Sequence, residues 1–83
     1  MIKILSFQFL EDDQLFLEFS DSSKGVFALS AYLESKQGTL LEPLKNPDYL
    51  KRVFLDAGAL AWPNGLEISP ARIYELTQKQ KAA

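Results

Sequence analysis

The sequence has no cysteine and no histidine among its 83 residues. The lack of cysteine excludes a disulfide framework, a thiolate zinc site and a cysteine nucleophile. The lack of histidine removes the commonest general base and the commonest metal ligand. The four glycines are isolated, so neither a phosphate-cradling loop nor a dinucleotide-binding fingerprint can be drawn. We therefore expect a protein that is not an enzyme, with no catalytic residue, no metal site and no cofactor.

Positive charge and long apolar segments are also scarce. Nine basic residues against eleven acidic ones give a formal charge of −2, which leaves no surplus of positive charge to neutralise phosphates. The longest apolar runs, residues 26–29 and 59–62, are too short to cross a bilayer. The first ten residues are interrupted by Ser6 and Gln8 and do not form the apolar core of a signal peptide. These features predict a soluble cytoplasmic protein that contacts neither nucleic acid nor membrane directly.

The sequence does contain enough apolar material for one small core. Hydrophobic residues make up 47% of the chain and aromatic residues 12%, which excludes a disordered tail. A chain of this length buries roughly 60% of its surface on folding, so we expect marginal stability. We predict a single domain over residues 1–83. Marginal stability favours association with another protein or with a second copy of the chain.

Alternating apolar residues in the first half predict an antiparallel meander of three strands. In the first of these strands, Leu5, Phe7 and Phe9 alternate with polar residues, which is typical of a half-buried strand. Polar residues between the alternating segments predict turns. The predicted strands are residues 2–9, 15–19 and 26–29, and the predicted turns are residues 11–13 and 20–24.

The second half predicts two further strands, at residues 53–56 and 59–62, joined by a tight turn at Ala57-Gly58. Pro63 ends the later strand because proline removes a backbone donor.

Between the two halves we predict an irregular segment flanked by short helices. Ser30 is placed to cap a helix over residues 31–35. Asn46 and Pro47 are typical of the cap and first position of a helical turn that reaches residue 50.

Helix signals are clearest near the C-terminus. Ser69 is placed as an N-cap and Pro70 as the first helical residue. Ile68 is placed to pack on Ile73 as a hydrophobic staple. The expected helix ends near residue 79, and its apolar side consists of Ile73, Leu76 and Thr77. Together, these elements predict an α+β fold: a small antiparallel sheet of about five strands, beginning with a three-stranded meander, with an amphipathic C-terminal helix packed on one face.

Two features of the sequence are candidates for binding sites. The carboxylates of Glu11, Asp12 and Asp13 are the ligands that Mg²⁺ or Ca²⁺ prefers, but they lack the spacing of a calcium loop, and a solvated hairpin turn is favoured.

The second feature is the run Trp62-Pro63-Asn64-Gly65. A tryptophan before a turn can serve as an exposed anchor for a partner protein, so these four residues are candidates for partner binding. The alternative is that Trp62 fills the core, and this alternative is favoured because tryptophan is highly buried on average.

The run from Trp62 through Gly65, followed by Leu66-Glu67-Ile68-Ser69-Pro70 and Ile73-Tyr74, resembles the C-terminal signature of a small bacterial family catalogued as domain of unknown function 2442. The resemblance also covers Pro43-Leu44, residues 50–56 and the strand–turn–strand segment that ends in Phe19 and Asp21. The family usually places a glycine directly after that acidic residue, where this chain has Ser22 and a later Gly25. This difference predicts a longer hairpin.

The resemblance implies a small α+β domain with no established enzymatic activity, and some members are similar to the antitoxin half of a gene pair. The leading hypothesis is a non-enzymatic protein-interaction module, the antitoxin-like member of a toxin–antitoxin-type pair, that binds a toxin-like neighbour through a sheet edge or the Trp62 turn. A regulatory or ligand-sensing domain that assists a DNA-binding partner is the second hypothesis. An enzyme that uses only Asp and Glu is the least favoured.

Overall fold

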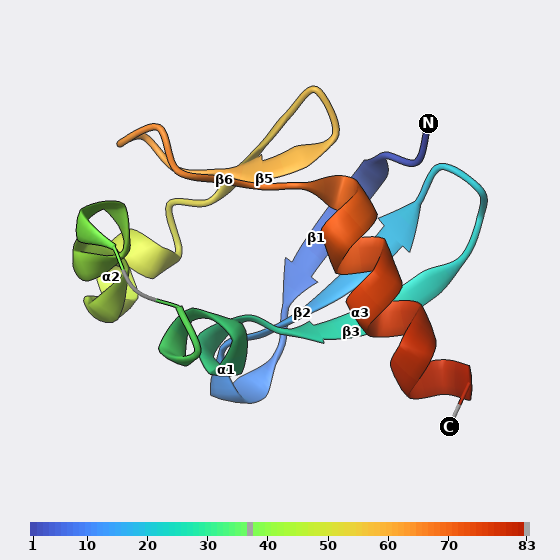
Figure 1. Cartoon of the computed structure of the whole chain (residues 1–83), viewed down its shortest axis with the longest axis horizontal. Coiled ribbons are helices and arrows are strands. Elements are labelled where there is room, and N and C mark those ends of the chain that lie inside the picture. Colours follow the sequence, from blue (N-terminus) through green and yellow to red (C-terminus); the bar gives the residue numbers. More distant parts are fainter. Residues whose placement is uncertain (37, 83) are drawn as a thin grey trace.

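The computed structural model describes residues 1–36 and 38–82, with side chains described up to residue 78. Three strands form the first sheet, which is antiparallel throughout and has the order β1-β2-β3 (Figure 1). This arrangement confirms the predicted meander. The strands are β1 (Ile4–Phe9), β2 (Gln14–Phe19) and β3 (Lys24–Ala28).

A bulge near the start of β1 changes the alternation along that strand. The register with β2 shifts between Ile4 and Ser6. Ile4 is buried as a result, while Leu5 is 58% exposed and does not share the environment of Phe7 and Phe9, which pack against the core. The prediction of one uninterrupted period over residues 2–9 is therefore wrong, because the bulge inserts one residue.

The acidic segment forms the first turn of the meander. Glu11–Asp13 is a short 3-10 helix, η1, in which Asp12 and Asp13 have positive φ angles of 59° and 55°. Asp tolerates this left-handed conformation better than most residues. The prediction of a hairpin turn at this segment is confirmed.

The second turn is short because Ser22 adopts a left-handed conformation, with a φ angle of 73°. The backbone N–H of Phe19 donates to the carbonyl oxygen of Ser23 at 2.9 Å, which leaves a loop of only Ser20, Asp21 and Ser22. Such three-residue loops place their last residue in the left-handed region, which usually favours glycine. The predicted longer hairpin is wrong because Ser22 takes this conformation in place of glycine.

A second antiparallel sheet, of order β4-β5-β6, follows later in the chain. The six strands therefore divide into two sheets of three, where the sequence suggested about five strands in one sheet. The sequence gives no alternating pattern for β6 because that strand has only two residues. The strands are β4 (Phe54–Asp56), β5 (Ala59–Ala61) and β6 (Glu67–Ile68).

The turn between β4 and β5, in the second sheet, is hydrogen-bonded to the first sheet. Ala57 and Gly58 both have positive φ angles, of 51° and 86°, as a two-residue hairpin turn of type I′ requires. The carbonyl oxygen of Gly58 accepts a hydrogen bond from the backbone N–H of Ile4 at 2.9 Å. A Cβ atom on Gly58 would lie only 2.6 Å from the Cβ of Lys3, so glycine also permits this close approach.

The segment between the sheets is more helical than predicted. The helix α1 begins at Leu29, so Ser30 lies in its first turn and is not the cap, which is Ala28. Residues 39–45, which the sequence predicted to be irregular, form a 3-10 helix. The Asn46 side chain accepts from the backbone N–H of Asp48 at 2.9 Å, which confirms the predicted cap. The elements are α1 (Leu29–Glu34), η2 (Thr39–Lys45) and α2 (Pro47–Leu50).

The C-terminal helix α3 (Pro70–Ala82) packs on β3, as predicted (Figure 1). Ile73 and Thr77 of this helix are buried. Gly25 in β3 permits the contact, because a Cβ atom there would lie 2.9 Å from the Cβ of Thr77. The hydroxyl of Ser69 accepts from the backbone N–H of Arg72 at 3.5 Å, in agreement with the predicted N-cap.

One core connects the two sheets and α3. Its largest fully buried side chains are Trp62, Phe19, Leu15, Leu17, Leu29, Leu60, Ile73 and Thr77. In the part of the chain that the structure describes, no helix combines the length and apolar character needed to span a membrane.

Candidate functional site

Trp62 belongs to the core and not to the surface. Its side chain is 1% exposed, and its indole N–H donates to the backbone carbonyl of Leu50 at 3.0 Å. This hydrogen bond satisfies the only polar atom of the side chain and ties α2 to the residue that follows β5. The structure confirms the core alternative for Trp62, so the indole is not an exposed anchor.

The turn after Trp62 is held in place mainly by Asn64. Its side-chain amide donates to the carbonyl of Leu40 at 2.9 Å, and its carbonyl oxygen accepts from the backbone N–H of Leu66 at 3.1 Å. The bond to Leu40 attaches the turn to η2 and the bond from Leu66 closes the turn itself, whereas Pro63 and Gly65 are exposed. The four predicted residues are adjacent in space, but only part of the turn is available to a partner, and partner binding there stays a prediction.

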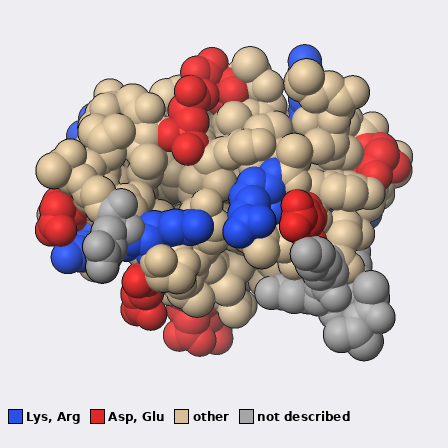
Figure 2. Space-filling model, viewed as in Figure 1, with Lys and Arg blue, Asp and Glu red and all other residues tan. Residues whose placement is uncertain are grey.

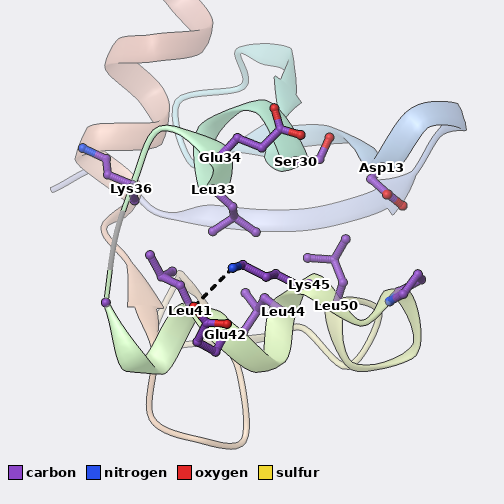
Figure 3. Close-up of a pocket in the computed structure, with 12 residues that line it drawn as sticks. Asp13, Ser30, Leu33, Glu34, Lys36, Leu41, Glu42, Leu44, Lys45 and Leu50 are labelled. Atoms are coloured by element: carbon purple, nitrogen blue, oxygen red, sulfur yellow. Dashed lines mark hydrogen bonds and ion pairs between the residues drawn. The ribbon is translucent and has the colours of Figure 1, made fainter.

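A pocket of about 590 Å³ lies between α1 and the segment formed by η2 and α2. Figure 3 shows leucine side chains from both walls directed into the space between them. Its volume lies in the range of roughly 300–1,000 Å³ that is typical of small-molecule sites. Sequence reasoning missed this pocket because it interpreted residues 38–47 as irregular. The apolar lining includes Leu33, Leu41, Leu44 and Leu50.

Charged side chains of both signs surround this apolar lining. The ammonium group of Lys45 lies 3.2 Å from a carboxylate oxygen of Glu42, as the dashed line in Figure 3 marks. Asp13 and Glu34 lie along the opposite wall, from η1 and α1. The pocket therefore offers an apolar surface with a polar rim. Its lining contains acids and amines but no imidazole or thiol.

The outer face of the first sheet carries exposed apolar side chains. Phe16 in β2 and Val26 in β3 are directly paired across the strands, and each is 38% exposed. Their neighbours along β2, Leu15 and Leu17, are fully buried on the opposite face. Leu5 at the bulge of β1 is another exposed apolar side chain of this sheet. Helix α3 packs on the inner face. The exposure of Phe16 and Val26 shows that no described element covers the centre of the outer face.

A hydrogen-bonded group of side chains ties the second turn of the meander to α3. One carboxylate oxygen of Asp21 accepts from the Tyr74 hydroxyl at 2.7 Å, and the other accepts from the hydroxyl and backbone N–H of Ser23, at 2.6 and 2.9 Å. The bond from Ser23 and the bond from Tyr74 lower the pKa of Asp21 to about 2. The bond to Asp21 raises the pKa of the Tyr74 hydroxyl, which must keep its proton to donate.

Charge is distributed evenly over the visible surface. Figure 2 shows acidic and basic side chains interspersed on the face in view, among a majority of uncharged residues. Such mixing provides no broad area of one sign on this face, and broad basic areas are what attract nucleic acid.

Comparisons with known proteins place the chain in a family. Neither a curated protein nor a solved structure matches it. Residues 4–78, which include both sheets and most of α3, match the model of a family described as a protein of unknown function, DUF2442. The match confirms the resemblance seen in the sequence, and the chain therefore belongs to the DUF2442 family.

Proposed function

We propose that this chain is a non-enzymatic protein-interaction module that binds another protein through its first sheet. The single observation that carries the proposal is the uncovered outer face of that sheet, with Phe16 and Val26 paired at its centre. A partner that removes apolar side chains of this size from water stabilises the complex. The absence of histidine and cysteine from the whole chain supports a role in binding and not in catalysis.

The edges of the first sheet support the same proposal. With the order β1-β2-β3, both β1 and β3 have a side that no strand of the described residues pairs with. Unpaired backbone groups along a strand can accept an extended segment of another chain. A partner that covers the outer face can therefore also pair with an edge, and the combined surface includes hydrogen bonds as well as apolar contacts.

The family resemblance provides the first partner to test, which is the product of a short gene beside this one. In this proposal the chain is the antitoxin-like member of the pair, and it neutralises a toxin-like neighbour by covering the surface through which that neighbour acts. This role needs binding alone, in agreement with a chain that has neither histidine nor cysteine.

The test combines growth and binding. Expression of the neighbouring gene alone is expected to inhibit growth, and co-expression of this chain is expected to restore it. Phe16→Glu places a charge on the outer face and should abolish the rescue. Phe54→Glu is the matched control, because Phe54 is 43% exposed but belongs to the second sheet. A harmless neighbour, or equal rescue by Phe16→Glu, would contradict the proposal.

The pocket between α1 and η2 favours a second candidate function, the sensing of a small molecule. Its apolar lining and mixed polar rim suit an amphipathic ligand, and its volume of about 590 Å³ is large enough for one. A ligand that binds only the folded state raises the melting temperature, so a screen of metabolites by thermal shift tests this candidate.

A variant that fills the pocket distinguishes specific binding from general effects. Leu41→Arg is expected to remove the thermal shift, because Leu41 lines this pocket. Leu40→Arg is the control, since Leu40 is next to Leu41 in the chain but is 46% exposed and does not line this pocket. If no metabolite raises the melting temperature, or if both variants respond like the parent chain, ligand sensing at this pocket is excluded.

A further inference from the structure

One side of β1 carries backbone groups that face away from the sheet. The backbone N–H of Leu10 donates to the carbonyl of Gln14 at 2.7 Å, so Leu10 directs its backbone groups toward β2. Hydrogen-bonded and non-hydrogen-bonded residues alternate along an antiparallel pair. Gln8 and Ser6 therefore also direct their backbone groups toward β2, whereas Phe7 and Phe9 direct theirs to the open side.

The open side is limited at one end by the turn of the second sheet. The backbone N–H of Ile4 donates to the carbonyl of Gly58, which places that turn against the start of β1. An added strand therefore has residues 6–10 available for pairing.

Beyond the bulge near its start, β1 lacks two of the features that protect edge strands from pairing, which are charge and proline. Residues 4–10 contain neither a charged residue nor a proline, although both are the usual means of blocking an edge. The other edge strand, β3, begins with an exposed lysine, and α3 packs on its inner face. Of the two edges, that of β1 is the less protected.

We propose that a second copy of this chain pairs with the β1 edge, antiparallel and about a two-fold axis at Gln8. This pairing places Phe7 of each copy opposite Phe9 of the other, so that the outward N–H and C=O groups of both residues bond across the axis. The two first sheets then join into one sheet of six strands. The proposal goes beyond binding to a different protein, which uses the outer face of the sheet.

The side chains of β1 suit this symmetric arrangement. A two-fold axis brings identical residues close together, and like charges directly opposite each other destabilise a pair of strands. Gln8, on the axis, is uncharged and its amide both donates and accepts, so two copies can bond to each other.

The aromatic side chains of β1 add apolar area to this interface. Phe7 and Phe9 are only partly buried, with their rings 6.3 Å apart in an edge-to-face arrangement. The corresponding rings of the second copy would cover them, and aromatic pairs in this geometry are favourable.

A single cysteine tests the position of the axis, because the natural chain has none. In the proposed pairing the two Gln8 residues form a non-hydrogen-bonded pair, with Cβ atoms about 4.5–5.5 Å apart. Gln8→Cys should therefore form a covalent dimer on mild oxidation. Ser6→Cys is the matched control, because Ser6 is also exposed on the same strand but would lie about 13 Å from its symmetry mate.

Charge variants of the same residue test the pairing in solution. Sedimentation velocity over a concentration series should show dimers of the natural chain. Gln8→Lys and Gln8→Glu should each be monomeric alone, because like charges meet at the axis. A mixture of the two in equal amounts should form dimers, and unfolded variants would not do so. A natural chain that stays monomeric at all concentrations, or equal cross-linking of the two cysteine variants, would overturn the proposal. Binding of a different protein is measured separately, with the natural chain and Phe16→Glu and without the Gln8 variants, because Gln8 pairs with Phe16 across the strands. Failure of one proposal is therefore distinguishable from failure of the other.

Discussion

Trp62 shows how a single side chain connects parts of this small fold. Its indole is fully enclosed, and its N–H reaches the carbonyl of Leu50 at the end of α2. Removal of a buried aromatic side chain loses both transfer free energy and packing, and a buried carbonyl that loses its donor costs further free energy.

We predict that Trp62→Phe lowers the free energy of unfolding by about 1–3 kcal/mol, because the bond to Leu50 is lost and the smaller ring leaves a cavity. Urea denaturation measures this change. Tyr32→Phe is the control, since Tyr32 is only partly buried and its hydroxyl makes no described hydrogen bond. A Trp62→Phe variant as stable as the natural chain would contradict the role of the indole bond.

Ser22 carries a backbone conformation that favours glycine, with a φ angle of 73°. Non-glycine residues in this region cost roughly 1 kcal/mol. We predict that Ser22→Gly raises the free energy of unfolding by about 0.5 kcal/mol, after the greater flexibility of glycine in the unfolded chain is subtracted. The measurement is chemical denaturation beside Ser20→Gly in the same loop, which should not be stabilised. Destabilisation by Ser22→Gly would show that the serine side chain contributes more than its backbone strain costs.

The contact between β3 and α3 depends on the absence of a side chain at Gly25. An added Cβ atom would lie 2.9 Å from the Cβ and 3.2 Å from the hydroxyl oxygen of Thr77, which is 2% exposed. We predict that Gly25→Ala destabilises the chain by about 1–3 kcal/mol, because the helix must move away from the sheet. Thermal denaturation measures the loss. Unchanged stability would show that α3 can shift at little cost.

The hydrogen bonds that Asp21 accepts from Ser23 and from Tyr74 make the stability of the folded chain dependent on pH. The pKa of Asp21 in the folded chain is about 2, below its ordinary value of 3.8, so folding favours the carboxylate. Its contribution to stability is therefore complete above a pH of about 4 and is lost as the pH falls toward 2.

Comparison with Asp21→Asn measures this pH dependence. The natural chain should have the higher melting temperature at neutral pH, and the difference should shrink as the pH falls through this range. At high pH the stability depends on pH in the opposite direction. Because the pKa of Tyr74 is raised in the folded chain, its contribution to stability is lost as the pH rises and the hydroxyl loses its proton. A difference in melting temperature that stays constant from pH 7 to about pH 2 would contradict the hydrogen bonds assigned to the Asp21 carboxylate.

The elements that the sequence predicted correctly are those with strong local signals. The Asn46 cap, the proline-started helix α3 and the Ala57-Gly58 turn each follow from a few adjacent residues. The errors arise where distant contacts decide the structure. The bulge near Leu5 and the two-residue strand β6 depend on pairing with other strands, which no local pattern records.

The candidate surfaces were less predictable than the elements. Burial of Trp62 was the favoured alternative, but its bond to Leu50 joins residues twelve positions apart. The pocket beside η2 requires the relative placement of α1 and η2, which only the folded chain provides. Exposure of Phe16 depends on which face of the first sheet α3 covers, and alternation alone does not decide between the two faces.

At the scale of the whole molecule, the chain presents surfaces and few reactive groups. It is small, carries a net charge of −2, and has neither histidine nor cysteine. Among the described residues, no element covers the outer face of the first sheet, where Phe16 and Val26 are exposed among polar side chains, and no strand pairs with the open side of β1. A chain of this size gains stability from any partner that binds its folded state, so we expect the complex to be more stable than the isolated chain.

The most direct measurement is a calorimetric titration of the purified chain with the product of the neighbouring gene. We predict saturable binding that Phe16→Glu weakens at least about tenfold, or about 1.4 kcal/mol, while Phe54→Glu binds like the natural chain. The absence of binding, or equal affinity of the two variants, would contradict the claim that this protein acts through the outer face of its first sheet.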